Sequence, residues 1–169
     1  MLSLNDIAYN HVKEKILSGA IRAGERIRED LLADDLSISR TPVREAINKL
    51  VMEDLVKSIP RRGIYCVRLT PDDICDLCDI RLMYEVYAVK RCIELCLPEE
   101  IFELEQLSVN FEKALLSNQS SATADNLFHE KLIDYARNGR LSSTYSLITN
   151  HLLIMHNMLD TDFICRKFL

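Results

Sequence analysis

Hydrophobic positions follow a helical period in three places within the first third of the chain. Residues 4–17 carry apolar side chains at the i, i+3, i+4, i+7 spacing, and Gly19 follows as a stop signal. Residues 29–36 and 41–53 show the same period, and Pro42 fits the first turn of the later helix because that turn needs no N–H. The side chains expected to face inward in these two helices are Leu31, Leu32, Leu36, Val43, Ala46, Ile47, Leu50 and Val51.

The period then changes from helical to extended. Residues 55–59 and 64–68 have the composition of short β-strands. They flank Pro60-Arg61-Arg62-Gly63, which predicts a hairpin with glycine at the turn. Three short helices and a hairpin in fewer than 70 residues predict a winged helix-turn-helix.

The rest of the chain predicts helices only. Thr70-Pro71-Asp72-Asp73 is a strong start signal, with a capping Thr, Pro at the first position and acids in the first turn. Helices are expected over residues 70–96, 97–116, 124–137 and 141–159, with a polar loop at 117–123 and a last segment starting at 160–162. The fold class is therefore mainly α: a winged helix-turn-helix domain over residues 1–69 and an all-α helical bundle over residues 70–169.

Composition supports a folded, reduced protein. With 48% hydrophobic and 28% charged residues the chain can bury a core. No apolar run approaches the ~18 residues of a membrane span, and no signal-peptide pattern opens the chain. We therefore expect a cytoplasmic protein whose six cysteines are reduced.

Four of these cysteines raise the question of a zinc site. Cys75, Cys78, Cys92 and Cys96 form two close pairs, but one continuous helix would hold the pairs ~21 Å apart. Buried, packing cysteines are the interpretation that fits this spacing, with a redox sensor as the alternative.

The net charge of −5 is unevenly distributed. Residues 1–68 carry twelve Lys or Arg against ten Asp or Glu, a net of +2, whereas residues 69–169 carry nine against sixteen, a net of −7. The asymmetry indicates two modules with different partners, and it removes the objection that an acidic chain cannot bind DNA.

The start of the third predicted helix carries chemistry suited to DNA. Ser39, Arg40 and Thr41 lie where backbone N–H groups and the helix dipole favour a phosphate. Arg40 and Arg44 are four residues apart, so both guanidinium groups project from one face. An arginine can hold the O6 and N7 edge of guanine with two hydrogen bonds. This stretch therefore predicts a recognition helix that enters the major groove.

The predicted hairpin adds a second basic group. Arg61, Arg62 and Gly63 form its tip and are expected along the DNA backbone or the minor groove, with Lys57 assisting. Two arginines on a short helix would alone indicate only a solvated surface. Basic groups at both the helix start and the hairpin tip favour binding of double-stranded DNA.

The segment SRTPVREAI at residues 39–47, with Leu50, Leu55-Val56 and the hairpin PRRG, resembles the GntR family of bacterial winged-helix regulators. The resemblance covers residues 4 to about 68. It implies that Arg40, Thr41 and Arg44 contact DNA and that Gly63 is the glycine of the wing. Two departures are visible: Asp30 stands where the family has a basic residue, and Asp54 stands where a glycine ends the recognition helix.

The second half resembles the FCD sensor domain of the FadR-like branch of that family, on residues 76–82, 125–132 and 136–141. The resemblance implies that Asp125 and His129 are two of four ligands of a divalent metal ion, zinc or similar. It also places Arg81 near a pocket, where a cation suits a carboxylate effector. Taken without the resemblance, Asp125 and His129 equally fit a helix-start acid and a packed histidine.

The metal-ligand set implied by the resemblance is incomplete in this chain, because the family's other two histidines lie on helices beyond residue 169. His151 and His156 are five residues apart, about 140° around a helix, and are expected as surface or partly packed side chains.

Together these features predict a dimeric, ligand-responsive repressor that binds an inverted-repeat operator. The alternative is a ligand-blind DNA-binding or dimerisation module with a degenerate sensor domain. An enzyme is not expected, because the sequence has no nucleophile motif, phosphate loop or H-E-x-x-H.

Overall fold

The computed structural model describes residues 2–116 and 122–159. These residues divide into two compact units, one of residues 2–70 and 157–159 and the other of Pro71–His156. The predicted segment from residue 160 and residues 117–121 of the predicted polar loop lie outside the described residues. No helix in the described ranges is both long and apolar enough to cross a membrane.

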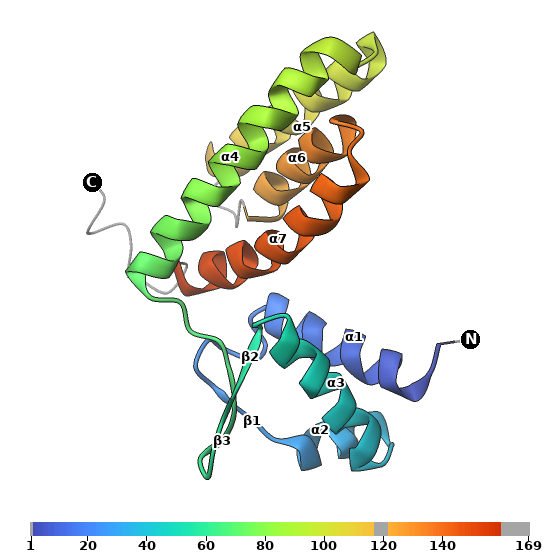
Figure 1. Ribbon diagram of the computed structural model, residues 1–169, viewed down its shortest axis with the longest axis vertical. Helices are drawn as coiled ribbons and strands as arrows, with labels where there is room; N and C mark the ends of the chain where they lie inside the picture. Colours follow the sequence, from blue (N-terminus) through green and yellow to red (C-terminus); the bar gives the residue numbers. More distant parts are fainter. Residues whose placement is uncertain (1, 117–121, 160–169) are drawn as a thin grey trace. The chain divides into compact units, whose positions relative to one another are not determined.

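The first unit is a winged helix-turn-helix, as predicted. Its helices are α1 (Leu4–Leu17), α2 (Glu29–Leu36) and α3 (Arg40–Met52), and its strands are β1 (Arg26–Ile27), β2 (Val56–Ile59) and β3 (Gly63–Cys66). The antiparallel sheet has the order β1-β3-β2, so β3 lies between the other two strands (Figure 1). The sequence did not predict β1, because two residues are too few to show a strand period.

The core of the first unit forms where α1 packs against α3. α1 starts at a capping box in which Asp6 N donates to Ser3 Oγ at 3.2 Å and Ser3 N donates to Asp6 Oδ2 at 3.3 Å. The side chains buried from these two helices are Ala8, Val12, Ile16, Pro42, Val43, Ala46, Ile47 and Leu50. Apart from Val51, which is half-buried, this confirms the predicted inward side of α3.

The predicted inward side of α2 is wrong at one position. Leu32 is buried and Leu36 half-buried, but Leu31 is 57% exposed and Ala33 is buried in its place. α2 is only two turns long and packs mainly against α3, so it buries one narrow face. Leu31 lies about 100° around the helix from Leu32 and falls outside that face.

The end of α3 explains the unusual residue at position 54. Leu55 N donates to Leu50 O at 3.0 Å and Asp54 N donates to Val51 O at 3.1 Å, which is the bond pair of a Schellman motif. This motif holds Asp54 at φ 55°, in the left-handed region that favours glycine. Asp54 therefore lies in the helix cap at the position where the resemblance has a glycine.

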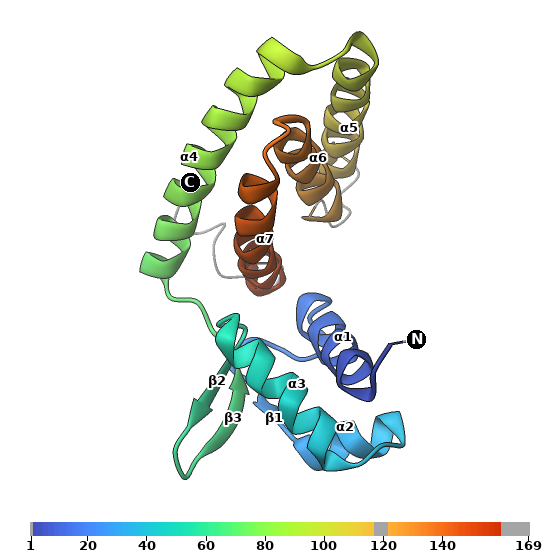
Figure 2. The same cartoon turned by 45° about the vertical axis from the view of Figure 1, so that its right-hand side comes forward.

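The second unit is a bundle of helices (Figures 1 and 2). It contains α4 (Pro71–Leu95), α5 (Pro98–Leu116), α6 (Ala122–Tyr135) and most of α7 (Gly139–Leu159), and α6 contacts both α4 and α5. α6 starts two residues earlier than predicted. The buried cluster in the core of the second unit consists of Ala88, Cys92, Leu132, Ile133, Ala136, Leu141 and Tyr145.

The cysteines of α4 are only partly the packing residues that we expected. Cys92 is buried and its Sγ donates to Leu132 O at 3.5 Å, and burial raises the pKa of its thiol. Cys75 and Cys78 instead lie exposed on the outward side of α4, so the packing interpretation is wrong for them. Because α4 is continuous, a four-cysteine zinc site is ruled out.

Replacing Asp54 by glycine is expected to stabilise the first unit by about 1 kcal/mol, because glycine adopts the left-handed region without the cost that a Cβ imposes. Chemical denaturation of Asp54→Gly measures this change in the free energy of unfolding. Asp54→Ala is the matched control, since it removes the carboxylate but keeps the Cβ. Equal stability of the two variants would contradict the assignment.

Candidate functional sites

The N-terminus of α3 presents an exposed surface suited to an anion. Ser39 is the N-cap residue and its side chain makes no capping hydrogen bond, while Arg40 and Thr41 occupy the exposed first turn. The first turn contains no acidic residue. The free N–H groups and the positive end of the helix dipole therefore face solvent beside a guanidinium group.

Arg44 lies one turn further along α3 and is exposed, as Arg40 is. Its guanidinium faces the Glu29 carboxylate at the start of α2, with Nε 3.4 Å from Oε1 and Nη2 3.3 Å from Oε2. Glu29 thus orients a residue that the sequence assigns to base reading. Sequence analysis missed this role because the two residues lie fifteen positions apart on different helices.

A second pair alters the surface at the start of α2. Arg28 Nε donates to Asp30 Oδ1 at 3.2 Å, and this guanidinium lowers the pKa of Asp30 to about 2. Asp30 therefore replaces an expected basic residue and also pairs with the neighbouring arginine.

The wing is built by β2, β3 and the turn between them. Arg61 at φ 62° and Gly63 at φ 117° form the turn, and Lys57, Arg61 and Arg62 are exposed. A Cβ at Gly63 would stand 3.0 Å from Arg26 Nε, so only glycine fits without displacing that side chain. Arg26, on β1, is a further basic residue of the wing, which sequence analysis missed along with its strand.

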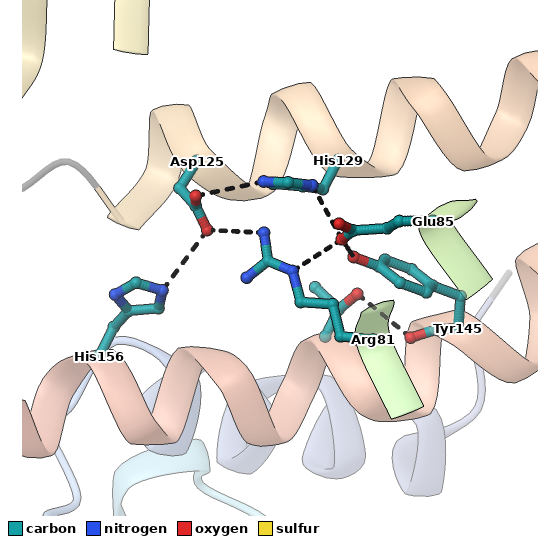
Figure 3. Close-up of polar contacts among 7 residues, drawn as sticks. Arg81, Glu85, Asp125, His129, Tyr145 and His156 are labelled. Carbon is teal, nitrogen blue, oxygen red and sulfur yellow. Dashed lines mark hydrogen bonds and ion pairs between the residues drawn. The ribbon is translucent and has the colours of Figure 1, made fainter. Parts of the chain in front are cut away.

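A polar cluster lies inside the second unit, where α4, α6 and α7 meet (Figure 3). Arg81 is its centre: Nε donates to Glu85 Oε1 at 2.7 Å and Nη2 donates to Asp125 Oδ2 at 3.1 Å. Tyr145 OH donates to Glu85 Oε1 at 2.7 Å. The Arg81 side chain is 15% exposed, so a charge that is largely shielded from water is held between two carboxylates.

Two histidines complete the cluster. His129 has Nε2 3.3 Å from Asp125 Oδ1 and Nδ1 2.8 Å from Glu85 Oε1, and His156 has Nε2 3.5 Å from Asp125 Oδ2 (Figure 3). Sequence analysis did not place His156 in the site, because its partner lies on a different helix. His151 stays outside the cluster, with Nδ1 2.9 Å from Leu147 O.

The charges of the cluster compensate one another. Burial alone would raise the pKa of Asp125, but contacts with His129, His156 and Arg81 outweigh it and hold that pKa well below its ordinary value. Burial likewise opposes the charged form of His129, yet the Asp125 and Glu85 carboxylates raise its pKa. The carboxylates are therefore ionised and already partnered.

The arrangement does not fit a divalent metal ion. Asp125 and His129 share a face, but Arg81 Nη2 lies 3.1 Å from Asp125 Oδ2, and its charge would repel a cation. Within the described parts of the chain, no group of three or more His, Cys, Asp or Glu residues could hold a metal.

Two family models match this chain. The model "Bacterial regulatory proteins, gntR family" matches residues 4–66, and the FCD domain model matches residues 76–164. The chain is 34% identical over 138 residues to the uncharacterized HTH-type transcriptional regulator YdhC of Bacillus subtilis, covering 80% of this chain and 62% of that protein. It is 30% identical over 133 residues to the gluconate operon transcriptional repressor of Bacillus subtilis, covering 75% of this chain and 52% of that protein.

Solved structures show the same fold. Escherichia coli McbR/YncC superposes with a TM-score of 0.73 at 22% identity, covering 96% of this chain and 78% of that chain. A Rhodococcus sp. RHA1 protein described as a GntR transcriptional regulator gives a TM-score of 0.76 at 20% identity, and the match covers 97% of this chain and 78% of that chain.

The two curated relatives carry the names of transcriptional regulators rather than enzymes, and this chain spans between half and two thirds of their length. The chain belongs to the GntR family of bacterial regulatory proteins, with a gntR-type helix-turn-helix region followed by an FCD domain.

Proposed function

We propose that this chain is a sequence-specific DNA-binding transcription regulator. The observation that carries the proposal is the exposed pair Arg40 and Arg44 on one side of α3, next to a wing with exposed Lys57, Arg61 and Arg62. In this proposal α3 enters the major groove and its first turn binds a phosphate. The wing binds the backbone or the minor groove and supplies affinity through released counterions.

Arg44 is proposed to read guanine with its two-pronged guanidinium. In the free protein Glu29 holds this fork at 3.3 and 3.4 Å, distances at the long end for hydrogen bonds to an ionised group. The pair is solvent-accessible on the Arg44 side, so its net stability is small. Glu29 therefore preorganises the fork and can give way to a base edge at little cost.

The proposed homodimer is supported by the outward side of α4. Four apolar side chains spaced four, three and four residues apart form one stripe: Leu82 (60% exposed), Val86 (45%), Val89 (44%) and Ile93 (80%). This is the spacing of a helix–helix seam. An antiparallel pairing centred between Tyr87 and Ala88 would place Leu82 of each copy opposite Ile93 of the other, and Val86 opposite Val89.

Ligand-responsive repression is also a proposal. The similarity to the gluconate operon transcriptional repressor supports a role in repression. Arg81 in the polar cluster supports a small carboxylate as the effector. Such an effector would compete with Asp125 and Glu85 for Arg81 and thereby shift α4 relative to α6 and α7. The metal ion implied by the family stays a prediction, and no step of this proposal depends on it.

A ligand-blind DNA-binding or dimerisation module is the second candidate. It is favoured by one observation: Arg81 already has two carboxylate partners inside the unit. A carboxylate ligand could bind Arg81 only by displacing Glu85 or Asp125, so the new ion pair would replace an existing one and add little binding free energy.

Removing the proposed base reader is expected to weaken binding in a sequence-dependent way. The probe is a duplex selected from a random library by the unmodified chain, and the readout is fluorescence anisotropy at fixed salt. Arg44→Ala should lose about 1–3 kcal/mol of binding free energy on this duplex and relax its preference at one position.

The matched control is Lys57→Ala on the wing. It should weaken binding to selected and unrelated duplexes equally and reduce the salt dependence. Unchanged affinity of Arg44→Ala, or an equal loss on unrelated DNA, would remove Arg44 from base reading.

The seam on α4 predicts a change of oligomeric state. Sedimentation at micromolar concentration should give a dimer for the unmodified chain and a monomer for Ile93→Glu, because a charge in the seam would be buried without a partner. Met52→Glu, an exposed apolar residue of the first unit, should stay dimeric. A monomeric unmodified chain, or a dimeric Ile93→Glu, would contradict this interface.

Calorimetry separates the ligand-responsive and ligand-blind candidates. Gluconate, citrate and zinc chloride are titrated into the unmodified chain, Arg81→Lys and His129→Ala. Heats with a carboxylate that Arg81→Lys removes are expected for the effector proposal, since lysine keeps the charge but loses the fork. Absence of carboxylate binding would favour the ligand-blind module, and zinc heats lost in His129→Ala would restore the metal site.

A further inference from the structure

We infer that a hollow on the second unit, separate from the polar cluster, is a binding site for a small phosphate monoester. The hollow has a volume of about 540 Å³ and lies between α4 and the turn that joins α6 to α7. Its lining includes Arg91, Arg137 and Arg140, together with Tyr87, Asn138 and Ser143. This inference does not depend on the proposed DNA binding or on the proposed effector at Arg81.

Three arginines lie together in this hollow although the unit as a whole is acidic. Residues 71–156 carry seven Lys or Arg against fourteen Asp or Glu, a net of −7, and contain only four arginines. Three of those four line this one hollow, whose lining includes no acidic residue. In so acidic a unit, a concentration of guanidinium groups marks a place where negative charge is stabilised.

The pairing of these arginines leaves donors for a ligand. Arg137 binds the Glu100 carboxylate through Nη2, at 2.8 and 3.1 Å, and Arg91 binds Glu94 through Nη1 at 2.8 Å. Each guanidinium has five N–H donors, so both keep further donors while their position is fixed. Arg140 forms no ion pair with any described residue, which leaves a full positive charge for an anion.

The turn after α6 positions one of these side chains. Arg137 follows the end of α6 with φ 53°, a left-handed conformation that is common at a helix C-terminus and that glycine adopts more easily. In this turn the Arg137 side chain lines the hollow.

The helix N-terminus itself is not the binding element. Asn138 Oδ1 already accepts from Arg140 N and Leu141 N, at 3.2 Å each, and so caps α7. An anion would therefore be held by side chains: the arginine forks and the Tyr87 hydroxyl, which accepts from Asn138 Nδ2 at 3.4 Å and keeps its own proton to donate.

These features select the class of ligand. Planar guanidinium forks match the oxygens of a phosphate, and a dianion suits one unpaired arginine beside two partly neutralised ones. The volume lies within the range of small-molecule pockets, and the polar lining suits a hydroxylated body. A sugar phosphate has this chemistry.

The hollow is compatible with the proposed dimer. Arg91 lies about 160–200° around α4 from Val89 and Ile93, so it projects away from the apolar seam. A second copy on the seam leaves the hollow open.

Glucose 6-phosphate, inorganic phosphate and neutral glucose are titrated into the full chain by calorimetry, in chloride of matched ionic strength. The two phosphates should bind and glucose should not. Arg140→Gln and Arg137→Gly should each weaken phosphate binding at least tenfold, whereas Lys113→Gln, with the same charge change on α5, should bind normally. Arg81→Lys should also bind normally, because it alters only the polar cluster.

Arg137→Gly gives the sharpest result, because glycine relieves the left-handed strain and should raise the melting temperature while binding is lost. A misfolded variant cannot produce that combination. No binding of either phosphate above the chloride control would overturn the inference. Equal affinities in Arg140→Gln, Arg137→Gly and the unmodified chain, or an equal loss in Lys113→Gln, would also overturn it.

Discussion

The packing of α1 against α3 is the constraint on which the first unit depends. Val43, Ile47 and Leu50 are buried almost completely in that contact, so the opposite side of α3 has to face solvent. Arg40 and Arg44 lie at the border of this contact, about 40° apart around the helix, and both are exposed. The chemistry proposed for DNA depends on this core, because the packing of α1 against α3 fixes the orientation of the helix that carries both arginines.

In the second unit, by contrast, charged side chains lie inside a helical bundle. Arg81 lies between Glu85 and Asp125, and His129, His156 and Tyr145 contact the same two carboxylates (Figure 3). Removing one partner of such a network leaves an uncompensated charge, which costs more than the network contributes. The cluster is therefore both a structural necessity and the place where an added anion would have its largest effect.

Local signals in the sequence were enough for most elements. The apolar period predicted α1, α3 and the long helices, and the PRRG turn predicted the wing, because each depends on neighbouring residues. Features that depend on distant residues were missed. Arg26 on β1, Glu29 beside Arg44 and His156 beside Asp125 meet their partners across 15 to 37 positions, and no period or motif records such contacts. The prediction that Leu31 faces inward was wrong for a related reason, since the width of the buried face on α2 is set by α3.

The central claim is that Arg44 and its neighbours read guanine from the major groove. Dimethyl sulfate methylates guanine at N7, in the major groove, and adenine at N3, in the minor groove. A methylation-interference experiment on the selected duplex tests the claim directly. The account predicts interference at guanine N7 in both halves of an inverted repeat, about one helical turn apart, and loss of that interference in Arg44→Ala. Full binding to duplexes methylated at every guanine N7 would contradict it.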